Sequence, residues 1–360
     1  MKMKIVTVVG ARPQFIKAAV VSRVFAAHKE VEEILVHTGQ HFDANMSNVF
    51  FEEMSIPQPH YNLNINSLSH GAMTGQMIEK IEGVLLKENP DWVLVYGDTN
   101  STLSGALAAK KLHIRVAHVE AGLRSFNMKM PEEINRILTD RISDMLFCPT
   151  DLAIENLKRE GFDNFPTRII KNGDVMQDAA IFYSAKAKKP NFELPDKFVI
   201  CTLHRAENTD DKERLLEIIS ALEDISLKCV VVLPLHPRTR AKLADINFDF
   251  QKSAIRFIEP VGYLEMVWLL KHCSLVMTDS GGLQKEAYFF EKYCITLRDE
   301  TEWVELVDNN FNILAGSDRG RILYGFNYLS ENMKGNFANR LYGNGDAGEK
   351  VYRELSNANS

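Results

Sequence analysis

Short runs of β-branched residues alternate with longer stretches of helical periodicity along the first half of the chain. We expect strands over 5–9, 34–37, 92–96 and 114–119. Helices are expected over 14–27, 73–87 and 102–111, and a further helix begins at Pro131. Proline suits the first turn of that helix, and the acids that follow suit its positive end. Strands that alternate with helices indicate parallel pairing, because parallel strands need a crossover connection.

A second series of the same kind follows Pro190. Its strands are expected over 198–203, 230–233, 275–278 and 293–297, with helices over 212–222, 263–272 and 283–290. We therefore predict an α/β fold of two Rossmann-like domains that face each other across a cleft. The N-terminal domain would span residues 1–171 and the C-terminal domain 172–343. The tail 344–360 is expected to return to the first domain.

The composition narrows the classes of function. The 360 residues include 42 Lys and Arg against 48 Asp and Glu, a net charge of −6, and 45% are hydrophobic. A mildly acidic chain argues against nucleic acid or a membrane surface as a partner. No apolar run approaches the ~20 residues that cross a bilayer. The chain starts directly in a strand-like run, with no pattern of a cleavable leader.

Five cysteines, at positions 148, 201, 229, 273 and 294, lie in apolar surroundings without C-x-x-C spacing. An odd number in such contexts favours buried, reduced thiols over disulfides or a zinc site. We therefore expect a cytoplasmic protein.

Polar side chains follow the expected strands, at the edge where open parallel sheets bind ligands. Asp98 and Glu120 come directly after two of these strands, and Glu132 opens a helix. Carboxylates brought together shift one another's pKa, which suits proton transfer near neutral pH. The alternative role of Asp98 is a cap for the next helix. An acid such as Glu120, placed after an apolar strand, needs a partner or a raised pKa.

The segment Asp279-Ser280-Gly281-Gly282 follows another strand and indicates an anion-binding turn. Two glycines there let backbone N–H groups approach an anion at a helix start, beside the serine hydroxyl. The alternative is a tight turn without a ligand. Arg12 and Lys17 flank the first helix start, where they either face a diphosphate or stay solvated. Neither G-x-G-x-x-G nor the P-loop motif occurs, which disfavours NAD and P-loop ATPase functions.

A catalytic metal is disfavoured. His118 and Glu120 share one face of a strand, because side chains two apart point the same way. Other histidines that add nitrogen are His37, His41, His204 and His236. However, no H-E-x-x-H, Cys/His pair at ligand spacing or D-x-D occurs. The missing D-x-D also argues against a magnesium-dependent sugar-nucleotide transferase.

Seven motifs occur in order along nearly the whole chain. They are Gly10-Ala11-Arg12-Pro13, Thr38-Gly39-Gln40-His41, Gly97-Asp98-Thr99, His118-Val119-Glu120-Ala121-Gly122-Leu123-Arg124, Pro131-Glu132-Glu133-Ile134-Asn135-Arg136, His204-Arg205-x-Glu207-Asn208 and Thr278-Asp279-Ser280-Gly281-Gly282. Together they resemble the non-hydrolysing UDP-N-acetylglucosamine 2-epimerase family. The resemblance implies the glycosyltransferase-B type architecture, two Rossmann-like domains with the ligand in the cleft.

The resemblance also implies an isomerase that inverts C2 of a UDP-N-acetylhexosamine. UDP leaves C1 as the C2 proton is removed, which gives a 2-acetamido glycal. UDP then adds back, and C2 is protonated on the opposite face. Asp98, Glu120 and Glu132 would be the acid and base groups, and His204 would stabilise the departing diphosphate. No metal or organic cofactor is required, since fixed donors aimed at the diphosphate stabilise its charge.

By the same resemblance, eight further residues bind the UDP-sugar. They are Arg12, Lys17, Arg136, His236, Ser280, Gly281, Gly282 and Glu286. Arg12 and Lys17 match positions near the phosphates, whereas Ser280, the two glycines and Glu286 match the UDP-binding turn and ribose contact. His236 is similar to a position in the nucleotide pocket, with a structural histidine at a strand end as the alternative. The family resemblance implies a homodimer.

Three departures from the family pattern point to a modified hexosamine. Gly-Thr-Arg-Pro-Glu, Asp-Thr-Thr and Thr-Glu-Arg-Pro-Glu are replaced by Gly-Ala-Arg-Pro-Gln (10–14), Asp-Thr-Asn (98–100) and Thr-Glu-Trp-Val-Glu (301–305). The acids are kept while sugar-proximal positions change. The chain therefore resembles most the branch that epimerises UDP-2,3-diacetamido-2,3-dideoxy-glucuronate for bacterial surface polysaccharide such as lipopolysaccharide. Segment 40–46 departs from the Gln-His-x-x-Met pattern of members activated by UDP-N-acetylglucosamine, so we do not expect that regulation.

Three other functions remain as alternatives. A hydrolysing epimerase would use the same fold and nearly the same acids but release UDP. A glycosyltransferase of this architecture would release UDP only in the presence of an acceptor. A non-catalytic sensor would bind the UDP-sugar without exchange at C2, and the three carboxylates would then have no evident purpose.

Overall fold

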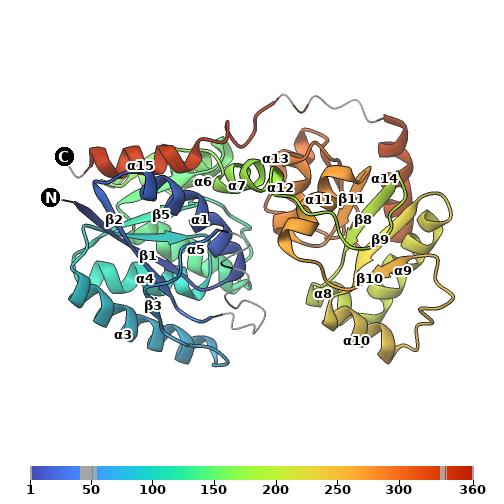
Figure 1. Ribbon diagram of the computed structural model, residues 1–360, viewed down its shortest axis with the longest axis horizontal. Helices are drawn as coiled ribbons and strands as arrows, with labels where there is room; N and C mark the ends of the chain where they lie inside the picture. Colours follow the sequence, from blue (N-terminus) through green and yellow to red (C-terminus); the bar gives the residue numbers. More distant parts are fainter. Residues whose placement is uncertain (1, 41–50, 52–54, 333–336, 338, 359–360) are drawn as a thin grey trace. The chain divides into compact units, whose positions relative to one another are not determined.

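The computed structural model describes residues 2–40, 51, 55–332, 337 and 339–358 (Figure 1). The chain forms two compact units. Unit 1 comprises Met1–Ala179 with Leu341–Ser360, and unit 2 comprises Ala180–Arg340. Each unit contains one parallel sheet covered by helices.

In the part of unit 1 that the structure describes, seven parallel strands pair in the order β3-β2-β1-β4-β5-β6-β7. The strands are β1 (Met3–Val9), β2 (Val31–His37), β3 (Tyr61–Asn62), β4 (Trp92–Tyr96), β5 (Arg115–Val119), β6 (Met145–Cys148) and β7 (Arg168–Lys171). The helices are α1 (Arg12–Ala27), α3 (His70–Glu88), α4 (Asn100–Lys111), α5 (Pro131–Ile142), α6 (Asp151–Arg159), α7 (Val175–Ser184) and α15 (Ala347–Asn357), with a 3₁₀ turn at Phe162–Asn164.

Unit 2 has six parallel strands among its described residues, in the order β10-β9-β8-β11-β12-β13. The strands are β8 (Phe198–Thr202), β9 (Val230–Pro234), β10 (Arg256–Ile258), β11 (Leu275–Thr278), β12 (Cys294–Thr296) and β13 (Asn312–Leu314). The helices are α8 (Ala206–Thr209), α9 (Lys212–Ser226), α10 (Pro237–Asp245), α11 (Tyr263–His272), α12 (Gly281–Phe289), α13 (Val304–Asp308) and α14 (Arg319–Asn332).

Both sheets have the strand order of a Rossmann fold, so the predicted α/β class is confirmed. Counted within each unit, the order is 3-2-1-4-5-6-7 in unit 1 and 3-2-1-4-5-6 in unit 2, and it reverses between the first and fourth strands. This switch point lies between β1 and β4 in unit 1, and between β8 and β11 in unit 2. Ligands of open α/β sheets bind outside the carboxyl ends of the strands at that point.

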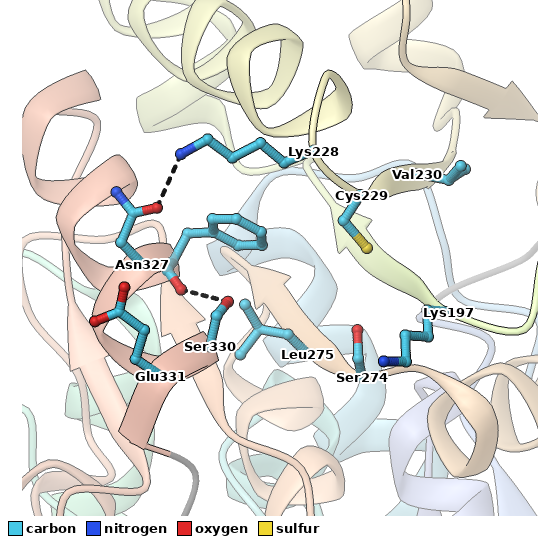
Figure 2. Close-up of a pocket in the computed structure, with 10 residues that line it drawn as sticks. Lys197, Lys228, Cys229, Val230, Ser274, Leu275, Asn327, Ser330 and Glu331 are labelled. Carbon is cyan, nitrogen blue, oxygen red and sulfur yellow. Dashed lines mark hydrogen bonds between the residues drawn. The ribbon is translucent and has the colours of Figure 1, made fainter.

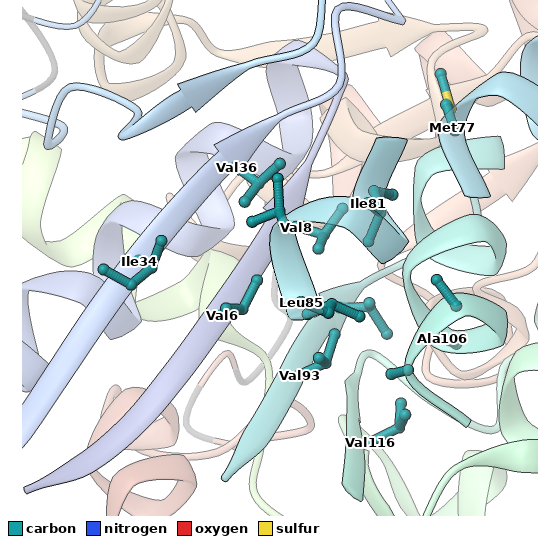
Figure 3. Close-up of a cluster of buried hydrophobic side chains, with 14 of the residues drawn as sticks. Val6, Val8, Ile34, Val36, Met77, Ile81, Leu85, Val93, Ala106 and Val116 are labelled. Carbon is teal, nitrogen blue, oxygen red and sulfur yellow. The ribbon is translucent and has the colours of Figure 1, made fainter. Parts of the chain in front are cut away.

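Aliphatic side chains from one face of the unit 1 sheet form a core with two helices (Figure 3). Val8, Val36 and Val93 point from the strands toward Ile81 and Leu85 of α3, and all five are buried. A buried valine, leucine or isoleucine side chain contributes about 1.5–3 kcal/mol. An equivalent cluster in unit 2 contains Phe198, Val232, Val276 and Ala287.

The chain passes from unit 1 to unit 2 within α7, at Ala179 and Ala180. Two contacts keep the start of α7 with unit 1. The Asp174 N–H donates to the carbonyl of Tyr342 over 2.8 Å, and the Asp178 carboxylate accepts the N–H of Gly348 over 2.9 Å. The returning segment 341–360 belongs to unit 1, where α15 packs on α1.

All five cysteines carry free thiols, and four of them are buried. None of the helices in the described stretches is long and apolar enough to cross a membrane.

His37 makes the stability of unit 1 sensitive to acid. Its side chain ends β2, is 7% exposed and lies edge-on to Phe15 with ring centroids 4.8 Å apart. Burial lowers the pKa of His37 to about 4. The fold therefore favours the neutral ring, and the associated stability is complete above pH ~6.5 and is lost as the pH falls toward 4.

We predict that lowering the pH from 7 to 4.5 reduces the free energy of unfolding of both proteins. The reduction should be about 2 kcal/mol larger in the wild type than in His37→Leu. The variant has no imidazole to protonate at this site, whereas the other titrating groups are shared. Urea unfolding of both proteins at the two pH values measures the difference. An equal loss in both proteins would contradict the assignment.

Candidate functional site

The two carboxylates predicted after adjacent strands lie side by side in the sheet of unit 1. β4 ends at Tyr96 and is followed by Gly97 and Asp98, whereas β5 ends at Val119 and is followed by Glu120. Tyr96 and Val119 are register partners, so both acids leave the carboxyl edge beside the switch point.

Glu120 is held in an unusual backbone conformation. Its φ is +72°, the left-handed region that residues other than glycine rarely adopt, at a cost of about 1–3 kcal/mol. The Glu120 and Ala121 N–H groups both donate to the carbonyl of Phe147, over 3.1 and 3.0 Å. The side chain is 8% exposed, and its carboxylate pairs with the Lys17 ammonium from α1. The predicted phosphate ligand Lys17 therefore contacts a predicted catalytic acid.

Gly97 leaves the space that this ion pair occupies. Its φ is +64°, and a Cβ on it would lie 3.3 Å from Oε2 of Glu120 and 3.5 Å from Nζ of Lys17. A methyl group at this position would therefore crowd the Glu120 carboxylate slightly and would be strained by the positive φ.

Asp98 is bound by an arginine and is surrounded by charges of both signs. Nη1 of Arg136 donates to its Oδ2 over 2.6 Å. Burial raises the pKa of Asp98; Arg136 and Lys17 oppose the rise, and the charges of Glu120 and Glu132 add to it. The net shift is upward, so this carboxyl can carry a proton closer to neutral pH than an ordinary aspartate.

Arg136 lies on helix α5 and is held beside Asp98 by a buried glutamate of the same helix. Glu133 is fully buried, binds Arg136 through Oε2 over 3.0 Å and accepts the N–H groups of Ser125 and Phe126. The predicted acid Glu132 is exposed and acts on Asp98 through its charge. Glu133, which the sequence analysis did not select, thus fixes the arginine that binds Asp98.

A buried ionic network that the sequence analysis also missed lies behind both acids. His118 Nδ1 is 2.7 Å from Oδ1 of Asp140, and its Nε2 is 2.7 Å from the carbonyl oxygen of Gly97. Arg124 Nη1 and the Gly122 N–H donate to Oδ2 of Asp140, over 2.7 and 3.1 Å. Burial opposes ionisation of Asp140, but His118 and Arg124 lower its pKa overall. His118 therefore has a structural role in this network, where the sequence analysis weighed it as a metal ligand.

In unit 2, the corresponding switch point carries His204 after β8 and Asp279 after β11. Asp279 is fully buried and accepts the backbone N–H of His204 at 3.0 Å and of Arg205 at 2.8 Å. Its Oδ1 lies 3.2 Å from Nδ1 of His204, whose side chain is 40% exposed. The carboxylate therefore fixes the His204 ring and leaves its other nitrogen for a ligand.

The Ser280-Gly281-Gly282 turn begins α12, as the motif predicted. Ser280 Oγ accepts the N–H of Leu283 over 3.4 Å, so the serine caps the helix. A Cβ on Gly281 would overlap Oε1 of Glu302, whereas one on Gly282 would meet nothing within 4 Å. Gly281 therefore makes room for a carboxylate of this chain, and the open approach to the helix lies at Gly282.

Glu302 is fixed over the turn by arginines. Arg298 Nη1 donates to its Oε2 over 2.8 Å. Burial opposes its ionisation, but Arg298 and, more weakly, Arg205 lower the pKa of Glu302 overall. The sequence analysis quoted Glu302 within segment 301–305 but assigned it no role at the turn, because it follows Gly281 by 21 positions.

The other predicted binding residues are less enclosed or already partnered. Glu286, on α12, accepts the Tyr263 hydroxyl over 2.9 Å. His236 caps α10 by accepting the N–H of Arg238, and its ring centroid lies 5.7 Å from that of His204. Burial and the neighbouring His204 lower the pKa of His236. Arg12 is exposed at the start of α1.

The three departures from the family pattern make specific hydrogen bonds. Gln14 Nε2 donates to the carbonyl of Tyr96 over 2.7 Å, which a glutamate could not do. Asn100 Oδ1 accepts from Asn135 over 3.3 Å. Trp303 Nε1 donates to the carbonyl of Gly281 over 2.9 Å. Each replacement thus supports the loops that carry the predicted site residues.

Segment 40–46 and the disfavoured metal site are the remaining features of the sequence analysis. His41 and most of segment 40–46 lie outside the described residues. Within the ranges that the structure does describe, no group of three or more His, Cys, Asp and Glu side chains could hold a metal ion.

The chain matches the family model described as UDP-N-acetylglucosamine 2-epimerase over residues 23–356. The chain belongs to this epimerase family. A UDP-2,3-diacetamido-2,3-dideoxy-D-glucuronate 2-epimerase of Pseudomonas aeruginosa is 55% identical over 98% of this chain and 99% of that protein. A UDP-N-acetylglucosamine 2-epimerase of Methanocaldococcus jannaschii is 44% identical over 98% and 99% of the two chains.

Solved structures of epimerases have the same fold. The M. jannaschii epimerase in complex with UDP-GlcNAc and UDP has a TM-score of 0.87 at 42% identity, over 99% of each chain. The UDP-GlcNAc 2-epimerase from Neisseria meningitidis bound to UDP-GlcNAc has a TM-score of 0.88 at 31% identity, over 99% of this chain and 100% of that one. The recognition of this family from seven motifs is confirmed.

We predict that Asp279→Asn lowers kcat/KM by about 10- to 100-fold, by analogy with the loss of groups that orient metal-binding histidines. The amide would place a donor against the N–H groups of His204 and Arg205. Steady-state kinetics across pH 6–9 measure the effect. Asp210→Asn, at an exposed acid of the same unit, is the control and should stay near wild type; equal losses in both variants would contradict the prediction.

Proposed function

We propose that the chain interconverts the gluco- and manno-configured forms of UDP-2,3-diacetamido-2,3-dideoxy-glucuronate by inversion at C2. The observation that carries this proposal is the pair of acids at adjacent strand ends, Asp98 and Glu120, each bound by a cation. The specific sugar is supported by the 55% identity to the P. aeruginosa enzyme of that name.

The chemistry requires two proton-transfer groups in different protonation states. The C2–H is not acidic in the ground state, so the bond from C1 to UDP must weaken as the proton leaves. Glu120, paired with Lys17, is suited to accept the proton as a carboxylate. Asp98, whose pKa is raised mainly by burial, is suited to deliver one on the opposite face. Re-addition of UDP to the glycal then completes the inversion with no net change in atoms.

Unit 2 supplies the groups that bind UDP in this proposal. The open backbone at Gly282 and the Ser280 hydroxyl lie at the positive end of α12, which favours a phosphate. Glu286 would bind the ribose, and His236 would border the nucleotide. His204, oriented by Asp279, would donate to the departing diphosphate and stabilise its charge.

Unit 1 supplies the remaining groups. Arg136 holds Asp98 and Lys17 holds Glu120, so both cations tune the acids while contributing positive charge for the phosphates. Arg12 is exposed at the start of α1 and would contact the diphosphate. Glu132 would act as the third carboxylate through its charge on Asp98. None of these steps calls for a metal or organic cofactor.

Proton NMR in D₂O tests the proposal. The enzyme is incubated in parallel with UDP-N-acetylglucosamine and with its 2,3-diacetamido uronic acid relative. We predict deuterium at C2 and a manno-configured product, formed faster from the diacetamido sugar. Glu120→Gln should slow exchange by about 10²–10⁴-fold, because it removes a proton acceptor with little change of shape. UDP affinity should stay within about two-fold, since the base does not hold the nucleotide.

Glu155→Gln, at an exposed glutamate of α6, is the matched control and should exchange as the wild type does. Absence of C2 exchange with both sugars would overturn the proposal. Accumulation of free UDP without a manno-configured nucleotide sugar would favour the hydrolysing epimerase, and release that depends on an added acceptor would favour a glycosyltransferase.

We further propose a homodimer in the cytoplasm. Free thiols at all five cysteines support a reducing compartment.

Ile134 and Leu138, 40% and 46% exposed, lie one turn apart on α5 and form an apolar stripe that a second copy could cover. We predict that Leu138→Glu halves the mass measured by light scattering. Leu227→Glu, at an exposed leucine of unit 2, should leave the mass unchanged; a monomeric wild type would contradict the proposal.

A further inference from the structure

His118 lies near the carboxyl end of β5 with its side chain fully buried, and both of its ring nitrogens meet acceptor atoms. Nδ1 is 2.7 Å from Oδ1 of Asp140, and Nε2 is 2.7 Å from the carbonyl oxygen of Gly97. A carbonyl oxygen only accepts hydrogen bonds, so Nε2 carries a proton. The state of Nδ1 follows from the state of Asp140.

Two further donors keep Asp140 a carboxylate. Nη1 of Arg124 and the N–H of Gly122 both donate to its Oδ2, over 2.7 and 3.1 Å. Burial opposes ionisation, but His118 and Arg124 lower the pKa of Asp140 overall. An ionised carboxylate has no proton to give, so Nδ1 of His118 is the donor in their bond. A ring that donates from both nitrogens is an imidazolium.

The surrounding charges compensate this buried cation. Arg124 donates through Nε and Nη2 to Glu160, over 2.7 and 2.8 Å. The cluster therefore contains two cations, His118 and Arg124, and two carboxylates, and buried charges are tolerated when they are paired in this way. The Cys148 thiol of β6 adds no charge, since burial and Asp140 raise its pKa well above the ordinary value.

The ring binds the residue that precedes Asp98. Gly97 has a φ of +64°, its N–H donates to the carbonyl of Val119 over 3.0 Å, and its own carbonyl accepts from His118. His118 and Val119 are the two residues before Glu120. Both backbone polar groups of the residue before one acid are thus bound by the two residues before the other.

We propose that His118, protonated on both ring nitrogens, is a positioning residue that sets the separation of Asp98 and Glu120. It acts by tying the Gly97 carbonyl to the fixed carboxylate of Asp140. Removal of a proton on one face of a sugar ring and delivery on the other depend on that separation, and a misplacement of about 1 Å can cost about 10²-fold in rate. Its effect on turnover rests on the proposed function, whereas its protonation and its effect on the separation do not.

Solid-state NMR tests the protonation without turnover. The full chain is labelled with ¹⁵N in histidine and ¹³C in glycine carbonyls, and dipolar coupling of Nε2 to the Gly97 carbonyl identifies the His118 ring. We expect two protonated nitrogens on this ring at pH 7.5. In Asp140→Asn the amide can donate to Nδ1 while its oxygen keeps Arg124, so only Nε2 should remain protonated. A single protonated nitrogen in the wild type would overturn the proposal.

Variants test the positioning. His118→Gln should lower kcat for exchange at C2 by about 10- to 100-fold and leave KM within about three-fold, because a glutamine amide cannot donate at both ends. Asp140→Asn, which keeps the bond from Nε2 to Gly97, should retain at least about a fifth of the wild-type kcat. Rates are expressed per UDP-binding site, so that partial unfolding does not imitate the effect.

Crystal structures measure the separation of the two acids directly. The distance between the Asp98 and Glu120 carboxylates should change by at least about 0.5 Å in His118→Gln, the tolerance of a productive site. An unchanged separation, or a wild-type kcat in this variant, would overturn the proposal. A wild type that does not exchange at C2 would count against the proposed function alone, and the NMR spectra and the separation would still decide the role of His118.

Ser330→Ala is the matched control, because it also removes a side-chain bond to a backbone carbonyl. Ser330 Oγ donates to the carbonyl of Phe326 over 2.7 Å, beside a pocket of about 710 Å³ in unit 2 (Figure 2). The lining of this pocket contains none of the predicted site residues that the structure describes. The kcat, the KM and the His118 signals should equal those of the wild type; a loss of kcat as large as in His118→Gln would overturn the proposal.

Discussion

A buried carboxylate, Asp140, holds together the part of unit 1 that carries the candidate acids. It neutralises Arg124, binds the His118 ring and accepts the N–H of Gly122. Through His118 the same group reaches the carbonyl of Gly97, the residue before Asp98. Removing one partner from a buried ionic network of this kind costs about 3–5 kcal/mol, because a charge is left uncompensated. The positions of both acids therefore depend on a residue that touches neither of them.

Unit 2 uses the same physical solution at its own switch point. Asp279 is fully buried at the end of β11 and binds two successive backbone N–H groups at the end of β8. In each unit, a carboxylate without solvent contact fixes the loop that presents an accessible functional side chain. The two fixed carboxylates are in the interior. Asp98 and His204, with 35% and 40% of their side chains exposed, remain accessible to a ligand.

The sequence analysis predicted β1, β2, β4, β5, β8, β9, β11 and β12, and it missed β3, β6, β7, β10 and β13, which have two to four residues each. The strand over 92–96 was predicted with its observed bounds, because five consecutive apolar residues end at a glycine. β10 and β13 have three residues each, too few for a recognisable period. Asp98 and Glu120 were predicted because strand ends are visible in a sequence. Glu302 was not, because only the tertiary fold brings it to Gly281.

Helix α5 shows why Glu132 was selected and Glu133 was not. Glu133, Arg136 and Asp140 are spaced at three and four residues, so they share the face that turns inward. Ile134 and Leu138 lie on the outward face. The helix thus buries charge and exposes aliphatic groups, the reverse of the pattern that a sequence-based prediction assumes. A helix of this kind is expected where a polar site, rather than an apolar core, is the partner inside the fold.

The return of the chain to unit 1 has a consequence during synthesis. α15 covers α1, with Gly348 against Val20 and the Tyr352 ring stacked on His28 at 3.7 Å. This helix follows the whole of Ala180–Arg340, so the ribosome makes it roughly 10–30 s after the rest of unit 1, at ~5–20 residues per second. During that interval the surface of α1 lacks its cover and is open to nascent-chain chaperones. The second unit can fold in the same interval, so the first unit to be translated is the last to be completed.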